Sequence, residues 1–133
     1  MLTANRRTFL SSAAIASLSP VVASGSDKLQ IPALVHHVFF WLKRPDSKTD
    51  LDRLLKGLAT LPRIESIRGS HFGVPANTEK RAVVDSSFSV SEVLFFDDAA
   101  GQKLYQDHPI HRQFVADCEH LWEKVVVYDV IRT

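Results

Sequence analysis

The sequence contains a single cysteine, Cys118, among 133 residues. One cysteine cannot form a disulfide within the chain, and it cannot supply a thiolate cluster for a metal ion. An excess of charge of one sign is also lacking, because 16 lysines and arginines are balanced by 15 aspartates and glutamates. Such a balance creates no extended positive surface for a polyanion, so we expect no nucleic-acid partner.

Several catalytic motifs are missing from the sequence as well. It has no Gly-rich phosphate loop, no dinucleotide fingerprint and no Ser-His-Asp order. Its histidines invite a zinc hypothesis, but no acidic residue or second cysteine stands near them at a spacing typical of metal ligands. We therefore expect no metal site and no cofactor.

Residues 1–23 lack acidic side chains and combine the pair Arg6 and Arg7 with an apolar stretch rich in Ala and Ser. This layout is typical of a signal peptide. The run from Asn5 to Leu10 resembles the bacterial twin-arginine export signal, although Asn5 departs from the usual Ser or Thr and the general secretory route is the alternative. The apolar stretch is too short for a good spanning helix, so we expect a periplasmic or extracellular protein with no stable membrane insertion after signal removal.

The rest of the chain reads as a linker, residues 24–33, and one domain, residues 34–133, with a modest core. Residues 34–43 form a dense run of branched and aromatic side chains that predicts a buried strand. Ser47 then has the spacing of a helix cap, and leucines follow it at helical intervals until Leu61–Pro62.

Two more strands are predicted over 64–72 and 87–96, and Glu92 interrupts the apolar alternation of the second of these. A helical stretch over 99–107 follows. A fresh helical segment is then predicted to begin at Pro109, since proline is tolerated in the first turn of a helix and not in its interior.

With a last strand over 124–131, the order of elements predicts an α+β fold of the ferredoxin-like βαββαβ type, with both helical regions on one face of an antiparallel sheet. The first and last strands are apolar on both sides. The face without helices should therefore meet a second copy of the sheet, and we expect a two-fold homodimer.

Three motifs carry a resemblance to a known family. They are His37-Val38-Phe39-Phe40, Tyr105 with His108-Pro109-Ile110-His111, and Leu121-Trp122-Glu123-Lys124 leading into Val125-Val126-Val127-Tyr128-Asp129. Over residues 34–131 the sequence thereby resembles the stress-responsive dimeric α/β-barrel (Dabb) family. The resemblance implies two ferredoxin-like sheets joined into a barrel, with a cavity between the sheet and the helices of each subunit.

One plant relative in that family is a polyketide cyclase that performs an intramolecular aldol condensation without a cofactor. By motif position, the resemblance implies that His111 is a general base, that Tyr105 assists it and that His37 lies in the same pocket. Strand periodicity alone does not choose between His36 and His37. His111 lies on the apolar stripe of its helix, where it could be a core histidine bonded to a carbonyl, an acid or base, or a metal ligand.

We expect a small, mostly apolar cavity suited to a hydrophobic molecule that bears a carbonyl group. Its predicted lining is Phe39, Trp41, Phe114 and Trp122, with His71 near the mouth. His108 precedes Pro109 and is suited to capping, so a structural role is favoured for this pair. The predicted activity is that of a cofactor-independent lyase, cyclase or isomerase, and the alternative is a non-catalytic stress-responsive binding or protective protein.

The signal-peptide hypothesis makes a direct prediction about the mature chain. N-terminal sequencing of the exported protein should give Ser24 as the first residue, because small Ala23 offers the cleavage edge. A secreted protein that still begins with Met1 would contradict cleavage.

Overall fold

The computed structural model describes residues 28–133, so the predicted signal peptide lies outside the described residues. The elements, in chain order, are β1 (Leu34–Leu42), α1 (Lys48–Leu58), the 3₁₀ turn η1 (Leu61–Arg63), β2 (Gly69–Gly73), β3 (Val90–Phe96), α2 (Ala99–Asp107), α3 (Pro109–Cys118), the 3₁₀ turn η2 (Glu119–Leu121) and β4 (Trp122–Ile131). In the described part of the chain, the helices are all too short or too polar to cross a membrane.

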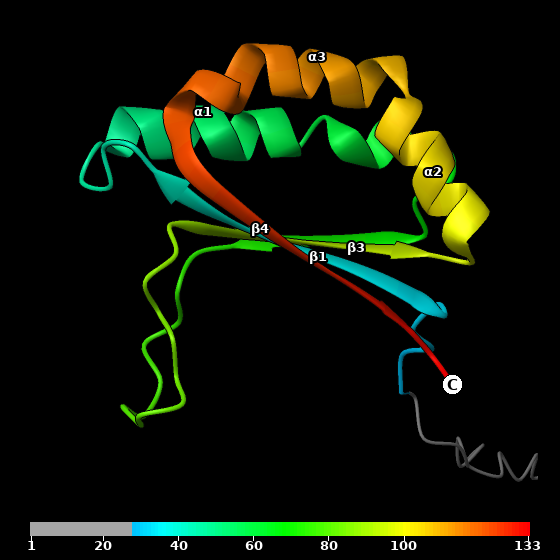
Figure 1. Ribbon diagram of the computed structural model, residues 1–133, viewed down its shortest axis with the longest axis horizontal. Coiled ribbons are helices and arrows are strands. Elements are labelled where there is room, and N and C mark those ends of the chain that lie inside the picture. Colours follow the sequence, from blue (N-terminus) through cyan, green and yellow to red (C-terminus); the bar gives the residue numbers. More distant parts are fainter. Residues whose placement is uncertain (1–27) are drawn as a thin grey trace, which may run out of the picture.

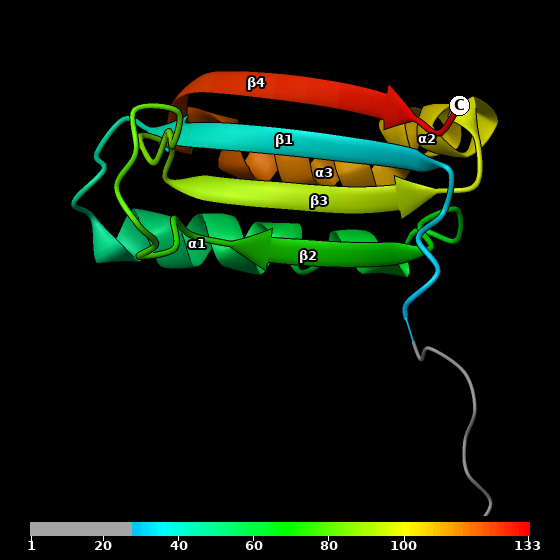
Figure 2. The ribbon, with the colours of Figure 1, turned by 90° about the horizontal axis from the view of Figure 1, so that it is seen from below.

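The four strands form one antiparallel sheet in the order β2-β3-β1-β4. All three helices lie on one side of it, and the other side carries none (Figures 1 and 2). This arrangement confirms the predicted ferredoxin-like α+β fold. We call the side without helices the open face; on β1 it is formed by Val35, His37, Phe39 and Trp41, which are only partly buried.

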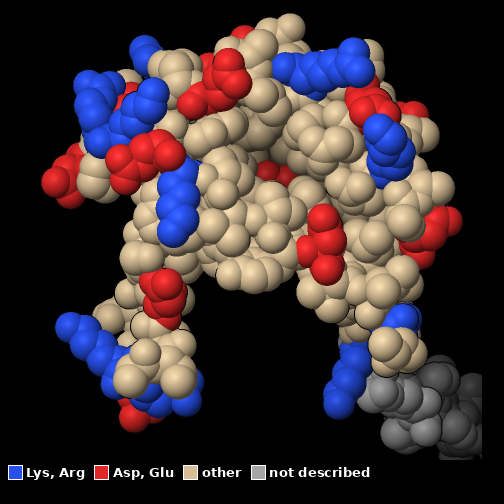
Figure 3. Space-filling view, viewed as in Figure 1, with Lys and Arg blue, Asp and Glu red and all other residues tan. Residues whose placement is uncertain are grey.

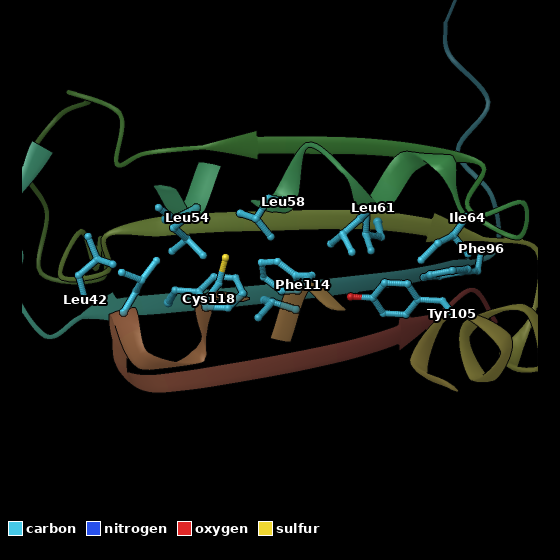
Figure 4. Close-up of a cluster of buried hydrophobic side chains, with 14 of the residues drawn as sticks. Leu42, Leu54, Leu58, Leu61, Ile64, Phe96, Tyr105, Phe114 and Cys118 are labelled. Atoms are coloured by element: carbon cyan, nitrogen blue, oxygen red, sulfur yellow. The ribbon is translucent and has the colours of Figure 1, made fainter. Parts of the chain in front are cut away.

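Alternation along the two central strands decides which residues enter the core. On β1 the buried residues are Leu34, His36, Val38, Phe40 and Leu42, and on β3 they are Val90, Glu92, Leu94 and Phe96. Helices α1 and α3 supply the apolar cover, including Leu54, Leu58 and Phe114 (Figure 4). Two ionisable residues, His36 and Glu92, are therefore buried among core side chains on the helix side of the sheet.

Helix α1 begins as predicted, because the Ser47 hydroxyl accepts a hydrogen bond from the backbone N–H of Asp50 at 3.2 Å. The predicted strand over 64–72 starts later than expected, at Gly69. Ile64 ends the η1 turn, where its N–H donates to the Leu61 carbonyl and its side chain is fully buried. Ile64 is apolar because it packs into the core from a turn, and it does not belong to a strand.

Close contact between α1 and α3 depends on the absence of a side chain at Gly57. A Cβ atom at this position would lie 2.5 Å from Cys118 Sγ and 3.0 Å from Phe114 Cδ2. Both distances are shorter than ordinary van der Waals contact, so even a methyl group must displace the side chains of Cys118 and Phe114 or the helix that carries them.

We therefore expect Gly57→Ala to lower the free energy of unfolding by about 1 kcal/mol, since overpacking exceeds the gain in helix propensity. Gly101→Ala is the matched control, because a Cβ there meets atoms no nearer than 3.5 Å. It should leave stability unchanged or raise it slightly in urea unfolding. Gly57→Ala should also cost less when Cys118 is already alanine, and an equal cost in both backgrounds would contradict the packing explanation.

Candidate functional site

A hollow of about 170 Å³ lies between the helices and the sheet. We call it the helix-side cavity; its lining residues are His36, Val38, Phe40, Glu92, Tyr105, Gln106, His111, Phe114, Val115, Trp122, Val125 and Val127. The cavity opens beside β4, where Val127 keeps 47 % of its surface exposed. Figure 3 shows this opening, with acidic atoms in its depth.

The break between α2 and α3 brings Tyr105 and His111 together. Six residues apart on a continuous helix, two side chains would point about 120° away from each other. Here α2 ends at Asp107 and Pro109 begins α3, and the two rings lie with their centroids 4.5 Å apart. The predicted helical break is thus confirmed, and it places both side chains in one cavity.

His108 stabilises the break as a helix cap. Its ring Nδ1 accepts a hydrogen bond from the backbone N–H of Ile110 at 3.1 Å, and its Nε2 lies 3.3 Å from Glu65 Oε2. In an unbroken helix the Ile110 N–H would have bonded to the Gln106 carbonyl. The cap therefore leaves the Gln106 carbonyl available to another donor.

His111 takes that free carbonyl. Its Nδ1 lies 3.0 Å from the Gln106 oxygen, and because a carbonyl only accepts, Nδ1 must carry the proton. The neutral ring then has its lone pair on Nε2. Burial lowers the pKa of His111, an effect that the hydrogen bond to Gln106 opposes and that nearby His36 reinforces, so the base form persists below the usual pH range.

Tyr105 is 2 % exposed, and its hydroxyl points into the interior of the domain (Figure 4). The hydroxyl donates to Glu92 Oε1 at 3.1 Å. Burial raises the pKa of Glu92 to about 7, against the smaller opposing effect of the Tyr105 hydrogen bond. Burial and then the Glu92 carboxylate raise the pKa of Tyr105, so the phenol remains a proton donor at neutral pH.

His36 is the histidine of β1 that reaches the cavity. It is 4 % exposed, its ring centroid is 5.5 Å from that of Tyr105, and its Nδ1 lies 2.5 Å from Asp129 Oδ1 on β4. The carboxylate fixes Nδ1 as the protonated nitrogen, as the Gln106 carbonyl does for His111. The site therefore holds two imidazoles, each with Nδ1 bound to an acceptor.

The structure does not bring His37 to Tyr105 and His111, which corrects the placement expected for it. His37 lies on the open face, where its Nε2 is 2.8 Å from Ser91 Oγ and its ring stacks on Phe39. Burial, followed by the nearby His71 and His36, lowers its pKa. The reason is the alternation of side chains along β1: His36 lies on the same side of the strand as the buried Val38 and Phe40, and His37 lies on the other side.

The other residues expected in the pocket are likewise divided between the helix side of the sheet and the open face. Phe114 and Trp122 line the helix-side cavity. Phe39 and Trp41 line a separate hollow on the open face, together with Phe88 and Tyr128. His71 is exposed on β2 and pairs with Val93, which also belongs to the open face.

Sequence reasoning missed His36, Glu92 and Asp129 as site residues. Glu92 left a visible signal, because it is an ionisable residue at a core position of an apolar, alternating strand. His36 and Asp129 left no such signal in the sequence, because β1 and β4 are apolar on both sides. The two residues come together only through the pairing of β1 with β4. No group of three or more His, Cys, Asp or Glu side chains within residues 28–133 is arranged to hold a metal ion.

Comparisons with known proteins agree with this architecture. A dimeric ferredoxin-like protein from Thermobifida fusca is 19 % identical, with a TM-score of 0.63 over 80 % of this chain and 97 % of that one. A Dabb family protein from Mesorhizobium loti is 24 % identical, with a TM-score of 0.61 over 75 % and 96 % of the two chains.

A hydroxynitrile lyase from Passiflora edulis is 20 % identical to this chain, with a TM-score of 0.63 over 78 % of this chain and 96 % of the lyase. The comparison with curated proteins gave no match. The profile of the Stress responsive A/B Barrel Domain family matches residues 34–132, which include every strand and helix described above. The chain therefore belongs to the stress-responsive A/B barrel domain (Dabb) family.

Proposed function

We propose that the helix-side cavity binds a small, mostly apolar molecule with a carbonyl group, and that His111 moves a proton on it without a cofactor. The observation that carries this proposal is the contact between Tyr105 and His111, a donor and a base that touch in one partly open cavity. Apolar side chains such as Phe114 and Trp122 form most of the remaining lining and suit a hydrophobic ligand.

The proposed step is the removal of a proton from the carbon next to the carbonyl. The C–H bond breaks, its proton goes to His111 Nε2, and its electron pair shifts onto the carbonyl oxygen. When its proton is not held by Glu92, Tyr105 donates a hydrogen bond to that oxygen as negative charge develops there. Return of the proton from His111 to a different carbon of the enolate completes an isomerisation. Loss of a hydroxyl group from the next carbon, which leaves as water with the proton of His111, completes a lyase reaction. Attack of the enolate carbon on a second carbonyl of the same ligand, whose oxygen takes that proton, completes a cyclisation.

The fold likeness to a hydroxynitrile lyase does not carry this proposal, because at 20 % identity it shows a shared fold alone. The proposal rests on the side chains of this cavity. A cavity of about 170 Å³ is smaller than those that hold drug-sized ligands, so the ligand should be small.

We further propose that the protein is a homodimer that joins two open faces. In a single subunit the open face exposes Tyr128 by 58 % and Val130 by 57 %, and it holds the aromatic hollow around Phe39 and Trp41. An apolar sheet face of this kind is unfavourable in water and is normally covered. The ferredoxin-like protein from Thermobifida fusca is described as dimeric, which supports a dimer here as well.

Export is also proposed, and its support is the composition of residues 1–23 alone. An exported protein would meet its small ligand outside the cytoplasm.

Deuterium exchange tests the base directly. In D₂O, the protein should catalyse exchange at the carbon next to the carbonyl of phenylacetone, followed by NMR. His111→Asn keeps a donor for the Gln106 carbonyl but has no basic nitrogen, so exchange should fall at least about 100-fold with little change in melting temperature.

His120→Asn is the control for that experiment, because His120 is exposed on the η2 turn. It should exchange at the wild-type rate. Wild-type protein that never exceeds the buffer rate would favour the non-catalytic binding or protective role, and full activity in His111→Asn would exclude His111 as the base.

The dimer is tested by placing a charge on the open face. Tyr128→Glu and Val130→Glu should each halve the molar mass measured by light scattering, because both side chains are exposed in the single subunit and would be buried by the partner. Val83→Glu, at a position 83 % exposed in the β2–β3 loop, is the control and should remain dimeric. A wild-type protein that is monomeric at high concentration would contradict the dimer.

A further inference from the structure

The role of Glu92 is not explained by the proposed proton transfer. Its side chain is buried with 1 % exposure, and its neighbours in the sheet are Val38 on β1 and Phe72 on β2. A carboxyl group in such surroundings is costly to keep charged. It is nevertheless part of the cavity lining and is bonded to the one phenol of the site.

The polar groups around Glu92 come from several elements. Helix α2 contributes Tyr105, α3 contributes His111, and β1 contributes His36, to which β4 adds Asp129. Helix α1 presents buried leucines. Among residues 28–133, no Lys or Arg forms an ion pair with Glu92, so no cation holds it in the charged form.

The hydrogen bond between Glu92 and Tyr105 has two possible directions. A carboxylate can only accept a hydrogen bond, so the phenol must donate its one proton to Glu92 and has none to donate into the cavity. A carboxylic acid can donate to the phenol oxygen, and the phenol proton is then free to reach a ligand. The two states differ in whether Tyr105 can donate to anything else.

We propose that Glu92 is a positioning residue for Tyr105: as a carboxylic acid it donates to the phenol and lets Tyr105 donate to the ligand oxygen, and as a carboxylate it withdraws that donor. The inference rests on the proposed function in one respect, that the ligand bears a carbonyl oxygen.

The direction of the pH dependence follows from the two groups. Glu92 has its pKa raised to about 7, so it is the neutral acid below that pH and ionises above it. His111 has its pKa lowered, so it remains an unprotonated base over part of the same range. Donor and base are therefore available together on the acidic side of pH 7, and the donor is lost as the pH rises.

Binding of acetophenone tests this without any requirement for turnover, because this ketone does not titrate. In wild-type protein its dissociation constant, measured by NMR, should increase about fivefold from pH 6 to pH 8.5 as the Tyr105 hydrogen bond is lost. Glu92→Gln keeps a donor to the phenol oxygen but cannot ionise, so its affinity should stay high and independent of pH. Glu119→Gln, at an exposed position, is the matched control and should follow the wild-type curve.

Tyr105→Phe supplies a second test in case Glu92→Gln does not fold. It should bind acetophenone about fivefold more weakly at pH 6 and show no change with pH. Wild-type affinity that does not vary with pH, or a pH dependence that survives in either variant, would overturn the role of Glu92 alone. Failure of wild-type protein to bind the ketone at any pH would overturn it together with the proposed function.

Discussion

The helix break at Pro109 determines where the reactive side chains lie. Proline cannot continue α2, so His108 caps the next helix and the Gln106 carbonyl is released from the helical ladder. His111 binds that carbonyl through Nδ1, and the change in helix direction places its ring against Tyr105. The three residues of the motif therefore act together: His108 caps α3, Pro109 breaks the helix, and His111 is a base fixed in one tautomer.

The site also shows how a small domain can tolerate buried ionisable groups. Glu92 and Tyr105 satisfy each other, and His36 reaches the partly exposed Asp129 at the edge of the sheet. An apolar residue at position 92 would carry no desolvation penalty of its own, so a carboxyl group there costs stability. The same burial that makes Glu92 unfavourable as an anion places its pKa close to neutral pH.

Much of the fold could be predicted from the sequence, because the signals were local. Ser47, Pro109 and the alternation around Glu92 each act within a few residues, and each is found where its pattern indicated. The choice between His36 and His37 could not be made this way. The side chains on both sides of β1 are mostly apolar, because one side meets the helices and the other forms the open face. Only tertiary packing distinguishes the two sides. The predicted start of a strand at Ile64 was wrong for a related reason, because a buried apolar residue in a turn cannot be distinguished by type from one in a strand.

The most direct test of the central claim is the tautomer of His111, read from the imidazole ¹⁵N chemical shifts of the neutral ring. Free histidine favours the proton on Nε2, whereas the structure predicts a proton on Nδ1 and a bare Nε2, because Nδ1 donates to the Gln106 carbonyl. A protonated Nε2 at pH values above the pKa of His111 would mean that the helix break does not prepare this ring as a base, and would contradict the mechanism built on it.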